Sequence, residues 1–371
     1  RPGAALSRLR FGFVSCANYE HGYFSAYRHL AEEEPDLVAF LGDYIYEYVE
    51  SKKPTVRHHS DGVEAADLRT YRNRYAQYRT DPDLQRLHAE APALTIWDDH
   101  EVQNDYADTW PQTRDDPAAF LKRRAGAYQA FYEHMPLRPS LSRPNGPNMR
   151  IYDRFTFGDL AQFSLLDGRQ YRSKPACYAR KARGHLESNA SCPERLEESR
   201  SILGQAQEEW LREGLSASQA RWKVVAQDVL MAELRQKLDT GETGYWTDDW
   251  NGYPAARRRL LTHIHEAQVK NVAVLSGDIH AFFQNDLKLD FADPASPTVA
   301  AEFVGTSVTS HPAPYEYFAK YLPDNPHIKF FESRYRGYVS VDLTHESCTA
   351  RYRAVSDAQD RLATVFTLKT F

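Results

Sequence analysis

The sequence predicts a layered α/β protein, and three observations support this fold class. Short runs of apolar and β-branched residues recur along the chain, as is typical of strands that are covered on both faces. Segments with apolar residues at helical spacing separate these runs. Each run ends in a cluster of polar residues, and ligands bind at such strand ends in open α/β sheets.

The apolar runs predict five strands, at residues 9–19, 36–47, 91–101, 222–231 and 271–282. The segments between them predict helices at residues 22–35, 67–81, 116–134, 204–216 and 253–267. Further along, polar and apolar residues alternate, which predicts an antiparallel hairpin of 336–346 and 348–355 and another strand at 299–310. We expect a single domain over residues 1–371, with long loops at 104–118, 139–150, 173–200 and 310–328.

Composition limits the classes of function. Apolar residues make up 42% and charged residues 26% of the chain, which is ordinary for a globular protein. The net charge of −5 argues against a general nucleic-acid-binding surface. The sequence contains no apolar run long enough to span a bilayer. Because the chain starts without Met, we expect a processed or trimmed product that has lost any targeting segment.

The four cysteines fall into two pairs of contexts. Cys177 and Cys192 lie in a polar stretch with few apolar residues to hold it, and a disulfide between them would stabilise such a segment. That disulfide would indicate an oxidising compartment, whereas two unpaired surface thiols are the alternative. Cys16 and Cys348 lie in strand-like contexts, where the simplest role is that of a small buried hydrophobe.

Several strand ends carry side chains of the kinds that bind metal ions. In chain order they are Cys16, then Asp43, Tyr46 and Glu47, then Asp98, Asp99, His100, Glu101 and Asn104, and finally Asp278 and His280. Each piece alone is common in proteins without a metal. Because the carboxyl ends of neighbouring parallel strands meet at one edge, we expect these pieces to converge on a metal site.

The types of ligand narrow the choice of metal. Thiolate and imidazole groups suit transition metals, whereas carboxylates and amides suit hard ions such as calcium, magnesium or manganese. A single ion does not usually need all of these groups, so we expect two or more ions with Asp43 as a bridge. Such sites serve phosphoryl transfer, because two cations stabilise both the attacking and the leaving oxygen.

A family resemblance rests on seven motifs: SCANY, LGDYIYE, WDDHEVQND, DGRQYR, DDWNGYPAARRRLL, LSGDIH and EFVGTSVTS. In this order, from about residue 9 to residue 345, they resemble the PhoD-like alkaline phosphatase and phospholipase D family. The resemblance implies the calcineurin-like metallophosphoesterase fold, with two mixed β-sheets flanked by helices. Many relatives carry an N-terminal β-sandwich domain, which we expect to be absent from this chain.

The resemblance also implies one ferric ion with one or two calcium ions, in preference to zinc. The residues that would hold iron are Cys16, Asp43, Tyr46 and His280, and those on the calcium side would be Asp43, Asp99, Asn104 and Asp278. His100 matches the catalytic histidine of the wider superfamily. Asp99 and Asp278 replace an Asn and a His of that superfamily, and both changes favour a hard ion.

Other polar residues have supporting roles in this interpretation. Arg169 is the candidate for holding the substrate phosphate, because its guanidinium matches phosphate oxygens, and a structural ion pair with Asp167 is the alternative. We expect Asp98 to cap or orient a neighbour and Glu101 to support a metal ligand. Four further histidines are expected to be exposed: His58, His59, His263 and His265.

The predicted function is a metal-dependent phosphoesterase of the alkaline phosphatase D type, acting on phosphate monoesters or diesters. Phospholipase D action on phospholipids is an alternative, and a non-catalytic calcium-dependent binding module is a more remote one. A zinc hydrolase is a further alternative: Cys16 and His280 would permit zinc, but Tyr46 and the many oxygen ligands fit it poorly. Members of the family are commonly exported in folded form, so we expect a monomeric periplasmic or secreted protein with no nucleic-acid partner.

Overall fold

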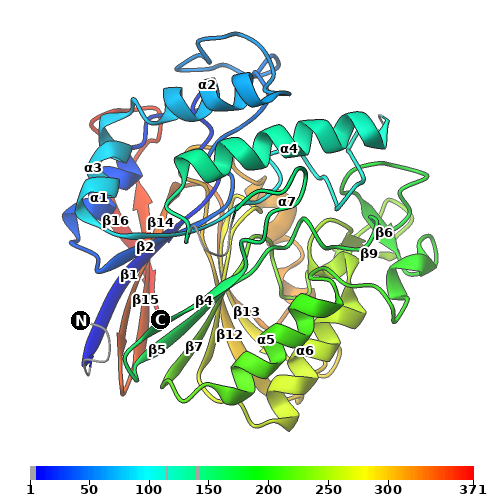
Figure 1. Ribbon diagram of the computed structural model, residues 1–371. Helices are drawn as coiled ribbons and strands as arrows, with labels where there is room; N and C mark the ends of the chain where they lie inside the picture. Colours follow the sequence, from blue (N-terminus) through cyan, green and yellow to red (C-terminus); the bar gives the residue numbers. More distant parts are fainter. Residues whose placement is uncertain (1–5, 114–115, 139–142) are drawn as a thin grey trace.

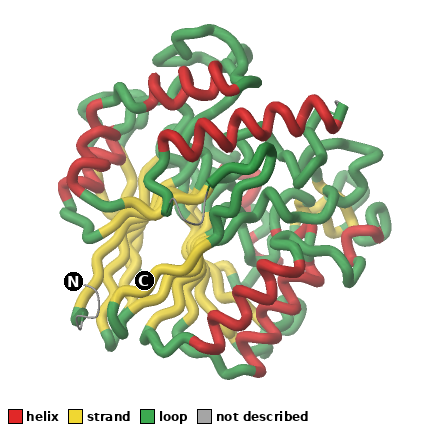
Figure 2. Tube along the Cα trace, in the orientation of Figure 1, coloured by secondary structure: helices red, strands yellow, loops and turns green. Residues whose placement is uncertain are grey.

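The structure is a computed structural model that describes residues 6–113, 116–138 and 143–371. Two large β-sheets pack face to face, and helices cover their outer faces (Figures 1 and 2). This arrangement of mixed sheets flanked by helices confirms the predicted fold class.

The first sheet has six strands in the order β16-β15-β14-β1-β2-β3. Strands β1, β2 and β3 run parallel to one another, and β14 pairs with β1 in the antiparallel direction. β14 and β15 form the predicted antiparallel hairpin. The bounds of the strands are β1 Arg8–Val14, β2 Leu37–Leu41, β3 Ala93–Ile96, β14 Arg336–Thr344, β15 Cys348–Val355 and β16 Val365–Thr370.

The second sheet has seven strands in the order β13-β11-β12-β10-β7-β5-β4, and its four central strands are parallel. Their bounds are β4 Asp153–Phe157, β5 Ala161–Leu165, β7 Trp222–Ala226, β10 Val272–Ser276, β11 Phe282–Lys288, β12 Thr298–Val304 and β13 Ile328–Glu332. A small third sheet contains β6 Leu186–Ser188, β8 Gln236–Lys237 and β9 Thr243–Trp246.

Helices α1 and α3 lie beside the first sheet, α2 and α4 pack on each other above the sheets in the view of Figure 1, and α5 and α6 cover the second sheet. The bounds are α1 Ser25–Glu32, α2 Leu68–Tyr78, α3 Pro82–Glu90, α4 Pro117–His134, α5 Gln205–Ala217, α6 Pro254–Glu266 and α7 Tyr315–Ala319, with 3-10 turns η1 Pro193–Leu196, η2 Trp250–Gly252 and η3 Leu322–Asp324. α3 was not predicted. Its N-cap is Asp81, which accepts hydrogen bonds from the amides of Asp83 and Leu84, so this residue starts a new helix and does not end the previous one.

Two hydrophobic cores hold these layers together. Between the two large sheets, the rings of Phe11 and Phe163 pack edge to face with centroids 5.1 Å apart. A second core, which includes Val274 and Leu261, lies between the seven-stranded sheet and α5 and α6. Each fully buried large apolar side chain contributes about 1.5–3 kcal/mol. The resulting scaffold fixes the positions of the strand ends.

The carboxyl ends of the parallel strands in both large sheets lie at the same edge of the sandwich. A parallel bridge between Ser15 and Ser307 joins the segment after β1 to the segment after β12. The amide of Cys16 donates to the carbonyl of Gly42, which joins the ends of β1 and β2. The polar clusters that follow these strands are therefore brought together.

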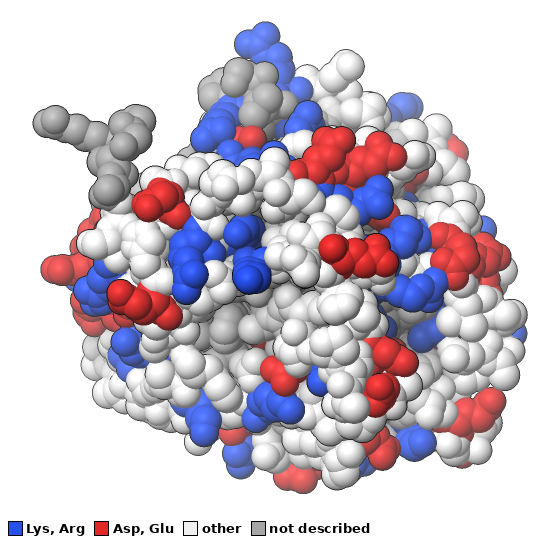
Figure 3. All heavy atoms as spheres, turned by 90° about the horizontal axis from the view of Figure 1, so that it is seen from below, with Lys and Arg blue, Asp and Glu red and all other residues white. Residues whose placement is uncertain are grey.

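The loop at residues 173–200 contains the predicted disulfide between Cys177 and Cys192, whose Cα atoms lie 6.0 Å apart. Two of the four histidines expected to be exposed are not. His59 is only 4% exposed, because it pairs with the buried carboxylate of Glu20 at 3.2 Å. His263 is half-buried, with Nε2 2.8 Å from the hydroxyl of Ser216. Within the described part of the chain, no helix combines the length and apolar character that crossing a bilayer requires. Acidic and basic side chains are interspersed on the face drawn in Figure 3.

Candidate metal centre

Four predicted metal ligands have left-handed backbone conformations. The φ angles are 59° at Cys16, 51° at Asp43, 63° at Asp278 and 55° at His280. Residues other than glycine rarely adopt this conformation, which costs about 1 kcal/mol or more for each of them. Such strain is typical of functional sites, where the surrounding structure holds the side chains in a required direction.

The first ligand group consists of Cys16, Asp43 and His280, whose ligand atoms all lie within 4.8 Å of one another. The hydroxyl of Tyr46 lies 2.8 Å from Oδ2 of Asp43 and 3.3 Å from Nε2 of His280. Nδ1 of His280 lies 2.7 Å from the carbonyl oxygen of His311 and so carries the proton. Nε2 of His280 therefore presents its lone pair to the group. These are the four residues to which the family resemblance assigns iron.

The second ligand group consists of four aspartates, Asp43, Asp98, Asp99 and Asp278, with oxygen atoms within 4.8 Å of one another. Asp43 belongs to both groups, as a bridging ligand must. Asp98 belongs to the second group as well, although the sequence suggests only a supporting role for it. Asn104 lies in the turn after β3, and its backbone amide donates to Oε1 of Glu47 at 2.9 Å.

The carboxylates of this site fit a bound cation. Oδ2 of Asp98, Oδ1 of Asp99 and Oδ2 of Asp228 are buried and have no hydrogen-bond partner among the described residues. Buried carboxylate oxygens without donors are costly and rare in proteins. Burial raises the pKa of Asp43, Asp98 and Asp278 well above its usual range, and neighbouring carboxylates add to this effect. A cation between these oxygens would offset the repulsion.

His100 lies beside both groups and is held by Glu47. Nδ1 of His100 lies 2.6 Å from Oε2 of Glu47, and the imidazole stacks on the ring of Tyr46 with centroids 4.1 Å apart. Burial opposes the charged form, but Glu47 and the nearby Asp99 and Asp43 together raise the pKa of His100 well above its usual range. His100 is therefore a cationic donor beside the carboxylates. The sequence pattern placed Glu47 among the metal-type side chains but could not indicate its contact with His100, which is 53 residues away.

Glu101 joins the ends of β2 and β3. Its carboxylate accepts hydrogen bonds from the backbone amides of Asp43 at 3.0 Å, Tyr44 at 2.6 Å and Asp98 at 2.8 Å. Gly42 lies at the same junction with a φ of +99°, and a Cβ atom there would lie 2.4 Å from Cβ of Asp98. Only glycine fits this position, so the close approach of the two strand ends depends on it.

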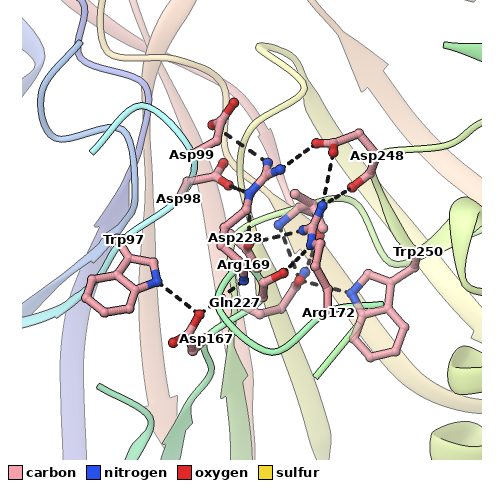
Figure 4. Close-up of polar contacts among 12 residues, drawn as sticks. Trp97, Asp98, Asp99, Asp167, Arg169, Arg172, Gln227, Asp228, Asp248 and Trp250 are labelled. Atoms are coloured by element: carbon pink, nitrogen blue, oxygen red, sulfur yellow. Dashed lines mark hydrogen bonds and ion pairs between the residues drawn. The ribbon is translucent and has the colours of Figure 1, made fainter. Parts of the chain in front are cut away.

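The guanidinium of Arg169 lies in a fully buried network behind the aspartates (Figure 4). Nε donates to Oδ1 of Asp98 at 2.5 Å, and Nη1 donates to Oδ2 of Asp248 at 2.7 Å. Nη2 has no hydrogen-bond partner among the described residues and lies 3.6 Å from Oδ1 of Asp99. From Arg169, Asp167 accepts the backbone amide at 3.1 Å, and the guanidinium pairs with other carboxylates. Asp167 also accepts the indole N–H of Trp97 at 2.9 Å and both the backbone and side-chain amides of Gln170 at 2.9 Å and 3.0 Å.

Asp248 connects two arginines, and the sequence analysis assigned a role to neither Asp248 nor Arg172. Nη1 of Arg172 lies 3.0 Å from Oδ1 of Asp248, whose other oxygen accepts from Arg169. Asp228 follows β7 and lies 3.7 Å from Nε of Arg169. Asp248 belongs to the family motif DDWNGYPAARRRLL and Arg172 to the family motif DGRQYR. Membership of these motifs is the feature of the sequence that could have indicated a role for both residues.

A cavity of about 490 Å³ lies beside the second ligand group. Asp105, Asp248 and Asp278 form its polar side. Its apolar side is built by Leu186, Leu234, Trp246, Ile279, Tyr317 and Phe318. The loops at 104–118 and 310–328 both contribute lining residues. The cavity therefore joins the ligand groups to an apolar surface.

The fold and the two linked ligand groups define a metal-binding α/β sandwich protein. The chain belongs to the PhoD-like phosphatase family, which matches residues 11–352, so the resemblance inferred from the motifs is confirmed. It is 43% identical over 377 residues to alkaline phosphatase D of Bacillus subtilis (strain 168). This alignment covers 100% of this chain and 63% of that relative. A solved structure titled "Structure of PhoD" superposes with a TM-score of 0.92 at 42% identity, covering 100% of this chain and 70% of that one. The chain thus spans less than two thirds of the length of the curated relative.

Proposed function

We propose that this chain is a metal-dependent phosphoesterase that hydrolyses small phosphate esters. The observation that carries the proposal is the position of Asp43, which belongs to both ligand groups. Two cations held this way can stabilise the attacking and the leaving oxygen of a phosphoryl transfer. The name of the relative, alkaline phosphatase D, supports the same class of reaction.

The chemistry of the donors supports Fe³⁺ in the first group and Ca²⁺ in the second. Thiolate, phenolate and imidazole ligands suit a transition metal, and Cys16, Tyr46 and His280 supply them around Asp43. The second group offers carboxylate oxygens, and such a set suits calcium better than zinc. In this proposal the side chain of Asn104 supplies one further oxygen ligand. When bound, the ions supply Lewis-acid activation of water and stabilise charge on the phosphate.

The protein's own residues orient the substrate and offset its charge. Glu47 holds Nδ1 of His100, which leaves Nε2 to donate a hydrogen bond to a phosphate oxygen or to the leaving alcohol. Arg169 fixes the carboxylates of Asp98 and Asp248. Its Nη2 atom forms an ion pair with Oδ1 of Asp99 at 3.6 Å but makes no hydrogen bond among the described residues, so it is the donor that would bind a phosphate oxygen. The sequence offered Asp167 as the alternative ion-pair partner of Arg169, but the guanidinium pairs with Asp98 and Asp248 instead.

Phospholipase D activity is the second candidate, and the apolar side of the cavity favours it. Trp246 is 38% exposed and Tyr317 is 36% exposed, although large aromatic side chains usually lie in the core. Both line the cavity next to Asp278, so an apolar part of a substrate would contact them. The disulfide supports placement of the protein in an oxidising compartment, periplasmic or secreted.

The experiment that tests the proposal compares three substrates on one preparation, with its metals and after chelation. p-Nitrophenyl phosphate, bis-p-nitrophenyl phosphate and phosphatidylcholine represent a monoester, a diester and a phospholipid. We expect hydrolysis of at least one of them, lost on chelation and restored by iron and calcium together. Full activity in the metal-free protein would exclude the proposed mechanism. No activity toward any ester with both groups loaded would instead favour a calcium-dependent binding module.

A further inference from the structure

A second cluster of metal-type side chains lies outside the candidate metal centre. His21, Glu50 and His311 come from the loops after β1, β2 and β12, and one ligand atom of each lies within 4.8 Å of the others. Nε2 of His21 lies 3.1 Å from Oε2 of Glu50. Adjacent ligands on a tetrahedral zinc ion are about 3.3 Å apart, since zinc binds nitrogen and oxygen at about 2.0–2.1 Å. The 3.1 Å contact is a hydrogen bond in this structure, and its length is close enough to the ligand spacing for an ion to replace it.

Two imidazole nitrogens in the cluster are buried and unsatisfied. Nδ1 of His21 and Nε2 of His311 have no hydrogen-bond partner among the described residues. The two rings lie with their centroids 3.9 Å apart, and His21 is only 4% exposed. Buried polar atoms without a hydrogen-bond partner destabilise a fold, so a ligand that contacts them is favoured.

Backbone contacts hold the carboxylate of Glu50 in place. Its Oε1 atom accepts hydrogen bonds from the amides of Lys52 at 2.7 Å and Lys53 at 3.2 Å, and Oε2 faces His21. The amide of Glu50 itself donates to the buried Oε2 of Glu20 at 2.7 Å. Contacts of this kind orient the ligands of metal sites. A separate cavity of about 170 Å³ is lined by His21 and His311 and gives an ion access to both.

We propose that His21, Glu50 and His311 bind one divalent transition-metal ion, with Zn²⁺ as the best fit. Two imidazoles and one carboxylate are a common ligand set for zinc, whereas calcium prefers oxygen ligands alone. The ion stabilises three loops against one another. The carbonyl oxygen of His311 accepts the Nδ1 proton of His280, so the ion also stabilises the loop that orients a ligand of the first group.

The test is a Zn²⁺ titration of the protein with its catalytic metals bound, followed by calorimetry and elemental analysis. We expect the wild-type protein to bind one additional Zn²⁺ without losing its other metals. His21→Ala, His311→Ala and Glu50→Gln should each weaken this binding by at least about 100-fold. His265→Ala is the matched control, because His265 is exposed on α6, and it should bind zinc as the wild type does. X-ray absorption at the zinc edge should show two imidazole ligands.

The variants also separate a metal site from a purely structural contact. His311→Ala removes the imidazole but keeps the carbonyl oxygen that His280 contacts, and Glu50→Gln preserves the shape of the side chain. Zinc should raise the melting temperature of the wild type and of His265→Ala but not that of Glu50→Gln, which decides the matter even if an alanine variant does not fold. Equal zinc binding by the wild type and Glu50→Gln would overturn the proposal, as would zinc that only displaces the catalytic metals.

Discussion

Tyr46 and Asp43 are separated by two residues, and both depend on the sharp backbone turn after β2. The left-handed conformation of Asp43 directs its carboxylate toward both ligand groups. The hydroxyl of Tyr46 donates to the carboxylate of Asp43 and accepts a hydrogen bond from the hydroxyl of Ser310 at 2.7 Å. The proposed iron site therefore depends on a few side chains whose contributions can be separated.

Tyr46→Phe should abolish or strongly shift the visible absorption of the iron-loaded protein. A phenolate bound to ferric iron absorbs visible light, and the phenyl ring provides no oxygen ligand. Tyr44→Phe is the control, since the Tyr44 hydroxyl contacts His88 at 2.9 Å and not the ligand group. Visible spectra and iron content of both variants provide the measurement. An unchanged spectrum in Tyr46→Phe would remove Tyr46 from the proposed iron ligands.

Glu101→Gln should lower the free energy of unfolding by about 1–3 kcal/mol. The carboxylate accepts three backbone amides, and an amide side chain would place its own N–H groups against one of those donors. Urea denaturation measures the loss. Glu266→Gln, at an exposed position on α6, should change stability little. Equal effects of the two substitutions would show that Glu101 does not hold the strand ends.

The pairing of β2 with β3 determines how close Asp43, which follows β2, lies to Asp98 and Asp99, which follow β3. Parallel pairing brings Leu41 opposite Ile96, so the residues that follow both strands leave the sheet side by side. Gly42 permits this approach because it has no Cβ atom. The position of Asp98 and Asp99 relative to Asp43 is thus a property of the paired strands.

Gly42→Ala should destabilise the protein more than Gly62→Ala and should also release metal. Both glycines have a positive φ, but a Cβ atom at Gly62 meets nothing within 4 Å, whereas one at Gly42 meets Asp98 at 2.4 Å. Backbone strain alone costs about 1 kcal/mol, which we expect for Gly62→Ala. Melting temperature and metal content should separate the two variants. Normal metal content in Gly42→Ala would show that the strand ends tolerate a wider separation.

For the molecule as a whole, the convergence of residues at strand ends could be predicted from the sequence, but the ion pairs between distant loops could not. Cys16, Asp43 and His280 follow apolar runs, and the topology of parallel strands makes such residues converge, so the sequence was sufficient to find them. Asp248 contacts Arg169 across 79 positions, and its place depends on the path of the loop after β9. No local pattern specifies that path. The fold class was predictable from periodicity, but these long-range ion pairs were not.

The stability of the metal-free protein should decrease as the pH rises. Burial raises the pKa of Glu101 and of Asp105 to about 7, and nearby carboxylates add to the shift of Asp105. The unfolded chain has values near 4, so the folded chain binds these protons more tightly. This contribution to stability is complete below about pH 4 and is lost as the pH rises to about 7.

Melting temperatures at about pH 5 and about pH 8, with and without chelation, test this dependence. The metal-free protein should melt at a lower temperature at the higher pH, and the metal-loaded protein should change less because cations stabilise the charged carboxylates. Chelation should therefore cost more stability at the higher pH. The opposite order would contradict the placement of cations among these carboxylates.

The most direct measurement concerns Asp43, which the two ligand groups share. Metal content and the kcat/KM for a phosphate ester that the wild type hydrolyses should be determined for Asp43→Asn, with Asp239→Asn at an exposed position as the control. We predict that Asp43→Asn loses metal from both groups and at least about 1,000-fold in kcat/KM, while the control keeps both. An Asp43→Asn protein that retains its metals and its activity would contradict a phosphoesterase centre built on a shared aspartate.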